Sequence, residues 1–125
     1  MDTPYTWTVD VEHDWGGRTS GILGIRNGLP ALLEIFRSHN VKALFFVSSE
    51  LAFDNSACLM RIMDHGHEIG SHGHFHIRYK ETFMAQQDRQ ISEKLLHHVT
   101  TNEALKYRAP WFQFQAEDSI YSYRN

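Results

Sequence analysis

The sequence predicts an α/β fold in which short parallel strands alternate with helices. Four short segments rich in β-branched and aromatic residues are separated by segments whose apolar residues recur at helical spacing. The connections between them are short, and this order favours a parallel sheet with right-handed crossovers. No internal repeat, linker or low-complexity tract interrupts the order, so residues 1–125 are interpreted as one domain.

The first half of the chain supplies two of the strands. Residues 5–11 form a β-branched and aromatic run that predicts a strand, and the polar, glycine-containing stretch 12–20 predicts a loop. Pro30 suits the first turn of a helix. The apolar residues of that helix recur at helical spacing: Leu29, Leu32, Leu33 and Phe36. Residues 42–48 are continuously apolar, which is typical of a strand buried on both faces.

The second half repeats the pattern. We expect Ser56 to cap a short helix, followed by a strand over residues 67–71. A longer helix is predicted over residues 81–100, and a fourth strand over residues 105–109. One face of the long helix is apolar and is expected to be buried: Met84, Ile91, Leu95 and Val99.

Composition and charge narrow the function classes. The net charge is −3 with the nine histidines neutral, so no broad basic surface favours nucleic acid or an anionic membrane as a partner. Cys58 is the one cysteine, so an internal disulfide is excluded. Residues 1–5 show no signal-peptide pattern, and apolar runs such as residues 43–47 are too short to span a bilayer. We therefore expect a cytoplasmic protein without a membrane span.

A first polar cluster follows the first predicted strand. Asp10 and Glu12 are two residues apart, so an extended backbone directs their side chains to the same side. One carboxylate could act as a free base while the other binds a cation. The cluster taken alone is equally consistent with a solvated acidic loop.

A second cluster is far more specific, because five histidines fall within residues 65–76. His72 and His76 are four apart and can converge on one ion in a helical turn or a tight loop, which Gly73 permits. Two imidazoles and a carboxylate make the three-ligand, open site of hydrolytic zinc, although cobalt, nickel and iron also accept such donors. An exposed polar loop is the alternative. His65 and His67 are expected to have structural roles.

A third cluster, residues 107–112, closes the fourth predicted strand. Arg108 can form a bidentate pair with a nearby carboxylate, which would orient that carboxylate and keep it ionised. Trp111 and Phe112 offer flat apolar faces that could stack on pyranose rings. Taken alone, this cluster is more consistent with core residues at the end of a strand than with a functional site.

Together these clusters contain three motifs that resemble those of the polysaccharide deacetylase family. They are Thr-Val-Asp-Val-Glu at residues 8–12, Gly-His-Glu-Ile-Gly-Ser-His-x-x-x-His at residues 66–76, and Arg-x-Pro at residues 108–110, in this order. The resemblance is to the N-terminal part of a chitooligosaccharide deacetylase-like domain, and it implies a distorted (β/α) barrel. Because that domain is longer, we expect a partial barrel, truncated before closure.

The resemblance also implies a reaction, the hydrolysis of N-acetyl or O-acetyl groups on a sugar or polysaccharide. Asp10 corresponds to the catalytic base, and Arg108 to the arginine that orients it. The backbone N–H of Trp111 falls where the family supplies a donor to the oxyanion, and Pro110 adjoins it on the substrate side.

For the metal, the resemblance implies His72 and His76 as two ligands of a divalent ion, with zinc expected. Many members of the family have adjacent aspartates in the first motif, and the second aspartate binds the metal. Here Val11 follows Asp10, which makes Glu12 the expected third ligand and Asp14 its rival.

Two other functions stay open. Relatives of this barrel act as amidases on small cyclic amides or ureides. The chain could also be a non-catalytic metal- or carbohydrate-binding fragment, because the family's late histidine, a general acid, has no counterpart. His97 and His98 fall inside the predicted helix 81–100, before the Arg-x-Pro motif.

Overall fold

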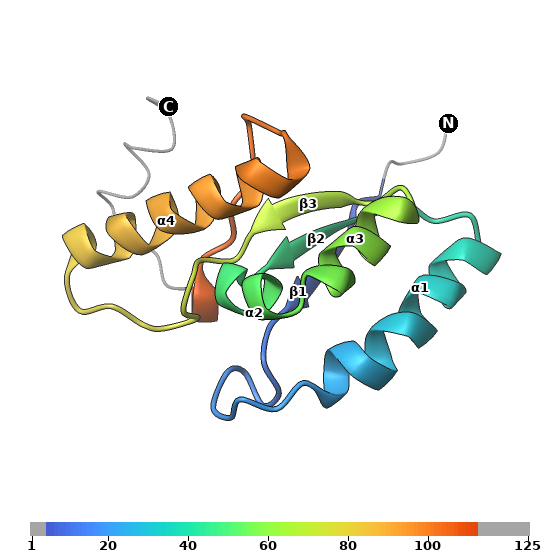
Figure 1. Ribbon diagram of the computed structural model, residues 1–125, viewed down its shortest axis with the longest axis horizontal. Coiled ribbons are helices and arrows are strands. Elements are labelled where there is room, and N and C mark those ends of the chain that lie inside the picture. Colours follow the sequence, from blue (N-terminus) through green and yellow to red (C-terminus); the bar gives the residue numbers. More distant parts are fainter. Residues whose placement is uncertain (1–4, 113–125) are drawn as a thin grey trace.

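The computed structural model describes residues 5–112. At its centre is a parallel sheet of three strands, in the order β1-β2-β3. These strands are β1 (Trp7–Val11), β2 (Ala43–Val47) and β3 (Glu68–Ser71), and their arrows run side by side in Figure 1. The predicted α/β class with parallel strands is therefore confirmed.

The central strand β2 is buried along its whole length. Ala43, Phe45 and Val47 belong to the main apolar core, whereas the alternate residues Leu44 and Phe46 are buried on the opposite face. The continuous apolar run in the sequence reflects this two-sided burial.

Helices cover the sheet on the side of the main core (Figure 1). A π-helical turn, Gly24–Gly28, leads into α1 (Leu29–Ser38), which joins β1 to β2. Two helices, α2 (Ser49–Asp54) and α3 (Ser56–Asp64), join β2 to β3. The buried face of α1 agrees with the predicted spacing: Leu29, Leu33 and Phe36.

The connection between β2 and β3 differs from the prediction. Helix α2 was not predicted, and Ser56 is the first residue of α3 rather than its cap. The N-cap position belongs to Asn55, whose side chain makes no capping bond to α3. Its Nδ2 instead donates to the carbonyl of Leu51 at 3.1 Å. The expected cap is therefore wrong, because one asparagine turns the chain directly from α2 into α3.

Helix α4 (Thr82–Thr100) has the predicted extent but not the predicted orientation. Its buried residues are Asp88, Ser92 and Leu96. Three of the four residues predicted to face the core are substantially exposed: Met84 by 48%, Ile91 by 45% and Val99 by 40%. The fourth, Leu95, is half-buried. The apolar pattern misleads because the buried face of α4 carries polar groups that hydrogen-bond to the loop after β3.

The predicted fourth strand is reduced to a single parallel bridge between Ser71 and Tyr107. Ser71 N–H donates to the Lys106 carbonyl at 2.7 Å, and Arg108 N–H donates to the Ser71 carbonyl at 2.9 Å. The ladder stops there because β3 ends at Ser71 and the next turn, Pro110–Phe112, begins with a residue that has no N–H. The segment nevertheless lies where the fourth strand was expected, beside β3.

Within residues 5–112 the sheet remains open and does not close into a barrel, as expected. The same part of the chain contains no helix that is both long enough and apolar enough to cross a membrane. The expected cytoplasmic location stays a prediction.

Candidate metal centre and active site

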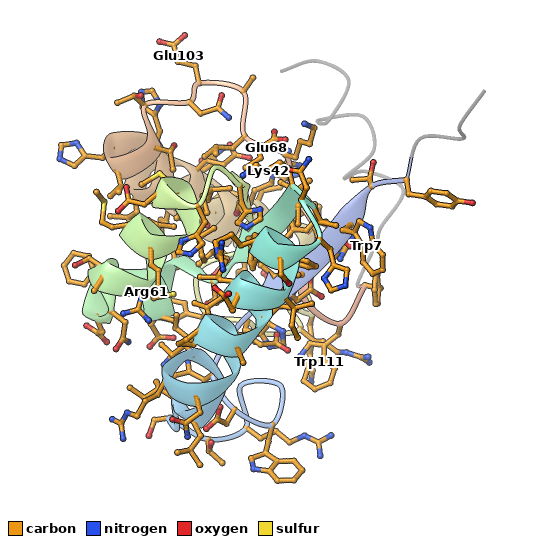
Figure 2. The ribbon with its side chains drawn as sticks, turned by 90° about the vertical axis from the view of Figure 1, so that its right-hand side faces the viewer. Trp7, Lys42, Arg61, Glu68, Glu103 and Trp111 are labelled. Carbon is orange, nitrogen blue, oxygen red and sulfur yellow. The ribbon has the colours of Figure 1, made fainter. Side chains whose placement is uncertain are left out.

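The three polar clusters of the sequence meet at one end of the sheet. Asp10 lies near the end of β1, His72 directly follows β3, and Arg108 follows the bridge to Ser71. Because the strands are parallel, their carboxyl ends share one edge, where sites of α/β proteins form. In Figure 2 Trp111 projects at this end of the sheet, away from Glu68 at the start of β3.

Glu12, His72 and His76 form a compact cluster at this edge. Each offers one ligand atom, and the three atoms lie within 4.8 Å of one another. His72 Nε2 is 3.4 Å from Glu12 Oε2, and His76 Nε2 contacts the same oxygen. Two imidazole nitrogens and a carboxylate oxygen are the donors of open zinc sites.

The cluster also has an unsatisfied polar atom. Glu12 Oε2 is buried and makes no hydrogen bond among the described residues, and both histidines are buried. A buried oxygen without a donor is costly unless a cation or another partner meets it. The three residues therefore fit a divalent metal ion.

Two features prepare the histidines as ligands. The Nδ1–H of His72 donates to the carbonyl of Arg108 at 2.8 Å, which leaves Nε2 as the free nitrogen facing Glu12. Burial lowers the pKa of His76 below its usual value, and the neighbouring His72 lowers it further, against the opposing attraction of Glu12. A neutral imidazole is the form that binds a metal.

Asp10 and Arg108 lie next to the cluster. Arg108 Nη1 donates to Asp10 Oδ1 at 2.9 Å, and Asp10 Oδ2 is 3.8 Å from His72 Nε2. The predicted contact is present but is not bidentate, because Nη2 donates to Thr8 Oγ1 at 3.1 Å. The guanidinium lies 4.4 Å from the centre of the Phe46 ring. Arg108 is thus fixed by three neighbours and leaves one oxygen of Asp10 directed towards the cluster.

Asp14, the rival ligand, is not brought to the cluster. Its two carboxylate oxygens accept hydrogen bonds from the backbone N–H groups of Leu23 at 2.8 Å and Gly24 at 2.9 Å. Both oxygens are therefore engaged in closing the loop that leads into the π-helical turn Gly24–Gly28. Glu12 is the carboxylate that the fold places beside the histidines.

The other histidines of the second cluster have structural contacts. His65 Nδ1 donates to the Arg61 carbonyl at 2.9 Å, and His67 Nδ1 accepts from the Ala43 N–H at 3.0 Å. His74 Nδ1 pairs with Ser49 Oγ at 2.7 Å. The structural roles expected for His65 and His67 are confirmed.

Trp111 forms one wall beside the cluster. Its ring centre is 5.3 Å from that of His76, and the guanidinium carbons of Arg18 and Arg78 lie 5.7 and 5.5 Å from the ring centre. The residue has φ of 58° within the turn Pro110–Phe112. Pro110 is buried, and a Cβ atom on Gly73 would lie 3.3 Å from its Cγ. The indole thus faces the site, while the proline lies under the histidine loop.

Sequence reasoning missed Asp88, which is buried in α4 beneath the loop that carries the two histidines. Its carboxylate accepts from the backbone N–H groups of His74 at 2.8 Å and Phe75 at 3.1 Å, and from the Tyr79 hydroxyl at 2.8 Å. One signal was present in the sequence: Asp88, Ser92 and Leu96 fall four residues apart, on one stripe of the helix.

Comparison with known proteins identifies the family. The model of the polysaccharide deacetylase family matches residues 17–117 of this chain. The chain belongs to this family. The match begins after β1, so Asp10 and Glu12 precede the matched stretch of this polysaccharide deacetylase chain.

The curated relatives of this chain are longer proteins. It is 29% identical over 123 residues to the peptidoglycan deacetylase of Helicobacter pylori, an alignment that covers 88% of this chain and 42% of the relative. It is 33% identical over 109 residues to a chitooligosaccharide deacetylase of Rhizobium leguminosarum, covering 82% of this chain and 44% of the relative. The chain spans less than half the length of these two relatives.

Solved structures share the fold of this chain. A peptidoglycan N-acetylglucosamine deacetylase superposes with a TM-score of 0.77 at 22% identity, covering 94% of this chain and 50% of the other. A CE4 family pseudoenzyme from Bacillus anthracis superposes with a TM-score of 0.72 at 20% identity, covering 94% of this chain and 41% of the other. The expected partial barrel is therefore confirmed as the fold.

Proposed function

We propose that the chain carries the metal-binding and water-activating part of a metal-dependent carbohydrate deacetylase. The observation that carries the proposal is the convergence of Glu12, His72 and His76 next to the pair formed by Asp10 and Arg108. A metal ligand set and a separately held carboxylate are the two components that hydrolysis of an acetamide requires.

Glu12, His72 and His76 would hold the divalent ion. Zinc suits this donor set, and cobalt, nickel and iron are alternatives. When bound, the ion supplies Lewis-acid chemistry at the acetamide carbonyl and makes the attacking water more acidic.

Asp10 is assigned as the base. Arg108 occupies Oδ1 of Asp10, so Oδ2 remains available to take the proton of the attacking water. The hydrogen bond from the guanidinium fixes the orientation of this carboxylate. The backbone N–H of Trp111 is proposed as a donor to the oxyanion of the tetrahedral intermediate. The proton for the leaving amine has no assigned donor among these residues.

The substrate is proposed to be an N-acetylated carbohydrate. Trp111 offers an aromatic face beside the histidines, on which a sugar ring can stack. Neither Arg18 nor Arg78 forms an ion pair with any residue in the described stretch 5–112, and both guanidinium groups flank the indole. This pair of cations favours a sugar that also carries an anionic group, such as a carboxylate. The names of the relatives, which include peptidoglycan and chitooligosaccharide deacetylases, support the carbohydrate class.

A second candidate is a non-catalytic metal- or carbohydrate-binding fragment. It is favoured because the described residues contain the metal-ligand cluster but no assigned proton donor for the leaving amine. Both candidates predict metal binding, so catalysis has to separate them.

The decisive experiment measures acetate release from chitooligosaccharides and from N-acetylated peptidoglycan fragments. We expect the zinc-loaded chain to release acetate, and both zinc removal by a chelator and the variant Asp10→Asn to abolish the release. Without a general acid, the rate should lie about 10²–10⁴-fold below that of an ordinary enzyme of this kind. Zinc binding without acetate release above that of Asp10→Asn would favour the non-catalytic fragment.

A further inference from the structure

Asp88 is an acidic residue whose side chain is enclosed by the protein. It is 6% exposed and lies in the middle of α4, below residues 73–76. Each carboxylate oxygen accepts a hydrogen bond from a different backbone amide: Oδ2 from the N–H of His74 and Oδ1 from the N–H of Phe75. The hydroxyl of Tyr79 also donates to Oδ1, at 2.8 Å.

These contacts couple the shape of the loop to one carboxylate. A buried charge is tolerated only when hydrogen bonds replace its hydration, and hydrogen bonds to an ionised acceptor are stronger than neutral ones. The loop must therefore direct two successive N–H groups at Asp88. Gly73 makes this approach possible, because it has φ of 78° and a Cβ atom there would lie 2.8 Å from Asp88 Oδ2.

The same loop is held from two further directions. The Ser92 hydroxyl, one turn after Asp88 on α4, donates to the Gly73 carbonyl at 3.1 Å. On the side of α2, the Ser49 N–H donates to the Gly73 carbonyl at 3.0 Å. The Ser48 hydroxyl donates to the His74 carbonyl at 2.9 Å. The backbone between residues 72 and 76 is thus fixed by hydrogen bonds from both neighbouring helices.

We propose that Asp88 is a positioning residue that sets the separation of His72 and His76 and so the affinity and geometry of the metal site. This inference rests on the proposed function, because it assigns the two histidines to a metal. Asp88 makes no hydrogen bond or ion pair with the imidazole ring of His72 or His76; it acts through the amides of His74 and Phe75, which lie between them in the chain. Outer contacts of this kind change metal affinity by about 10–100-fold when they are removed.

The test compares Asp88→Asn with the matched control Glu93→Gln in the 125-residue chain. Glu93 lies on the same helix and pairs with Arg89, and among the described residues it makes no hydrogen bond to the loop 72–76. In Asp88→Asn an amide NH₂ replaces one oxygen and faces a backbone N–H, so one of the two loop contacts must break. Hydrogen exchange at the His74 and Phe75 amides, measured without metal, should accelerate at least tenfold in Asp88→Asn and stay unchanged in Glu93→Gln.

The second measurement titrates both variants with zinc and records the visible spectrum with cobalt. We expect Asp88→Asn to bind zinc about 10–100-fold more weakly and to alter the cobalt bands, while Glu93→Gln matches the parent chain. A purely structural role would lower thermal stability but leave the cobalt spectrum and the zinc affinity of the folded variant unchanged, and that result would overturn the inference.

The outcomes separate this inference from the proposed function. If the parent chain binds no zinc, the proposed function fails. Independently of zinc, hydrogen exchange in Asp88→Asn at the same rate as in the parent chain would refute the anchoring of the loop by Asp88. If Asp88→Asn does not fold, Asp88→Glu takes its place, because it keeps the charge but displaces the carboxylate by one methylene from the N–H groups of His74 and Phe75. A folded Asp88→Glu with unchanged zinc affinity and unchanged cobalt spectrum would count against the inference.

Discussion

The Nδ1–H of His72 donates to the backbone carbonyl of Arg108 at 2.8 Å, so a proposed metal ligand and the arginine that holds the proposed base share one hydrogen bond. The side chain of the same arginine reaches Asp10. One residue therefore orients both halves of the site, the histidine through its main chain and the aspartate through its guanidinium.

This division predicts that the two functions of Arg108 can be separated. In Arg108→Lys the carbonyl that accepts from His72 remains, whereas a single ammonium cannot contact Asp10 and Thr8 in the way the guanidinium does. We expect zinc affinity to stay within about twofold of the parent value and acetate release to fall about 10²-fold, because the base is misplaced. Isothermal titration with zinc and an acetate assay measure the two quantities. If Arg108→Lys lost zinc affinity together with acetate release, the two functions of Arg108 would not be separable.

Removal of the proposed ligands should remove the metal. The double variant His72→Ala/His76→Ala leaves only one of the three donors. After dialysis against a zinc buffer, elemental analysis should therefore detect no zinc bound to this variant. His74→Ala is the matched control, since the His74 side chain pairs with Ser49 outside the cluster, and it should retain zinc. Full occupancy in the double variant would refute the assignment.

Glu12 and Asp14 should respond differently to loss of charge. Glu12→Gln removes the charged donor between the histidines, and zinc affinity should fall at least about tenfold. Asp14→Asn should keep zinc but lower the free energy of unfolding by about 0.5–2 kcal/mol, because two backbone N–H groups lose a charged acceptor. Zinc titration and urea unfolding give both numbers, and the reversed pattern would make Asp14 the ligand.

The environment of His67 predicts that the free energy of unfolding decreases in acid. Burial lowers the pKa of His67, and Lys42 and His65 lower it further, while its Nδ1 accepts from the Ala43 N–H. The unfolded chain therefore takes up the proton first, at about pH 6.5, so this contribution to stability is present above that pH and is lost as the pH falls.

His67→Asn keeps an acceptor for the Ala43 N–H but cannot be protonated. Urea unfolding of the metal-free chain between pH 8 and 5 should show a steeper decline for the parent than for His67→Asn. The difference between the two slopes should not exceed about 1.4 kcal/mol per pH unit. Identical slopes would exclude His67 as a source of the decline.

Arg18 and Arg78 should make binding depend on substrate charge. Replacing both with glutamine removes the two cations beside Trp111. The affinity for a carboxylate-bearing N-acetylated sugar should then fall by about 5–10-fold at low salt, whereas the affinity for a neutral chitooligosaccharide should fall by less than about twofold. Trp111→Ala should lower the affinity for both sugars, since each would stack on the indole. Calorimetric titration distinguishes the two patterns, and equal losses for the neutral and the acidic sugar in the double arginine variant would argue against charge recognition.

The sequence predicted those parts of the fold that depend on apolar burial in β2 and α1, where an uninterrupted run and a helical spacing report packing directly. It also predicted that the acidic and histidine clusters would meet, since the carboxyl ends of parallel strands share one edge, while the choice of Glu12 over Asp14 came from the family resemblance. The buried face of α4 could not be predicted in this way. Asp88 and Ser92 are polar residues buried by hydrogen bonds to a loop, and a hydrophobic pattern counts them as solvent-facing.

The extents of two other elements were beyond sequence reasoning for similar reasons. The segment around Tyr107 has strand-forming residues, but the length of its ladder depends on where β3 ends and not on its own composition. Helix α2 contains only six residues, too few for a helical period to appear. The hydrogen bond from Arg108 to Thr8 joins residues 100 positions apart, so no local sequence pattern indicates it.

The shared oxygen of Glu12 has a consequence for folding. It joins the end of β1 to the loop after β3, two segments that are distant in the sequence and connected through β2. A bound ion would act there as a reversible cross-link that exists only in the folded chain. The free energy of unfolding should then rise by about 1.4 kcal/mol for each tenfold increase in free zinc above the dissociation constant. In a cell the availability of metal would thus set the fraction of chains that is folded.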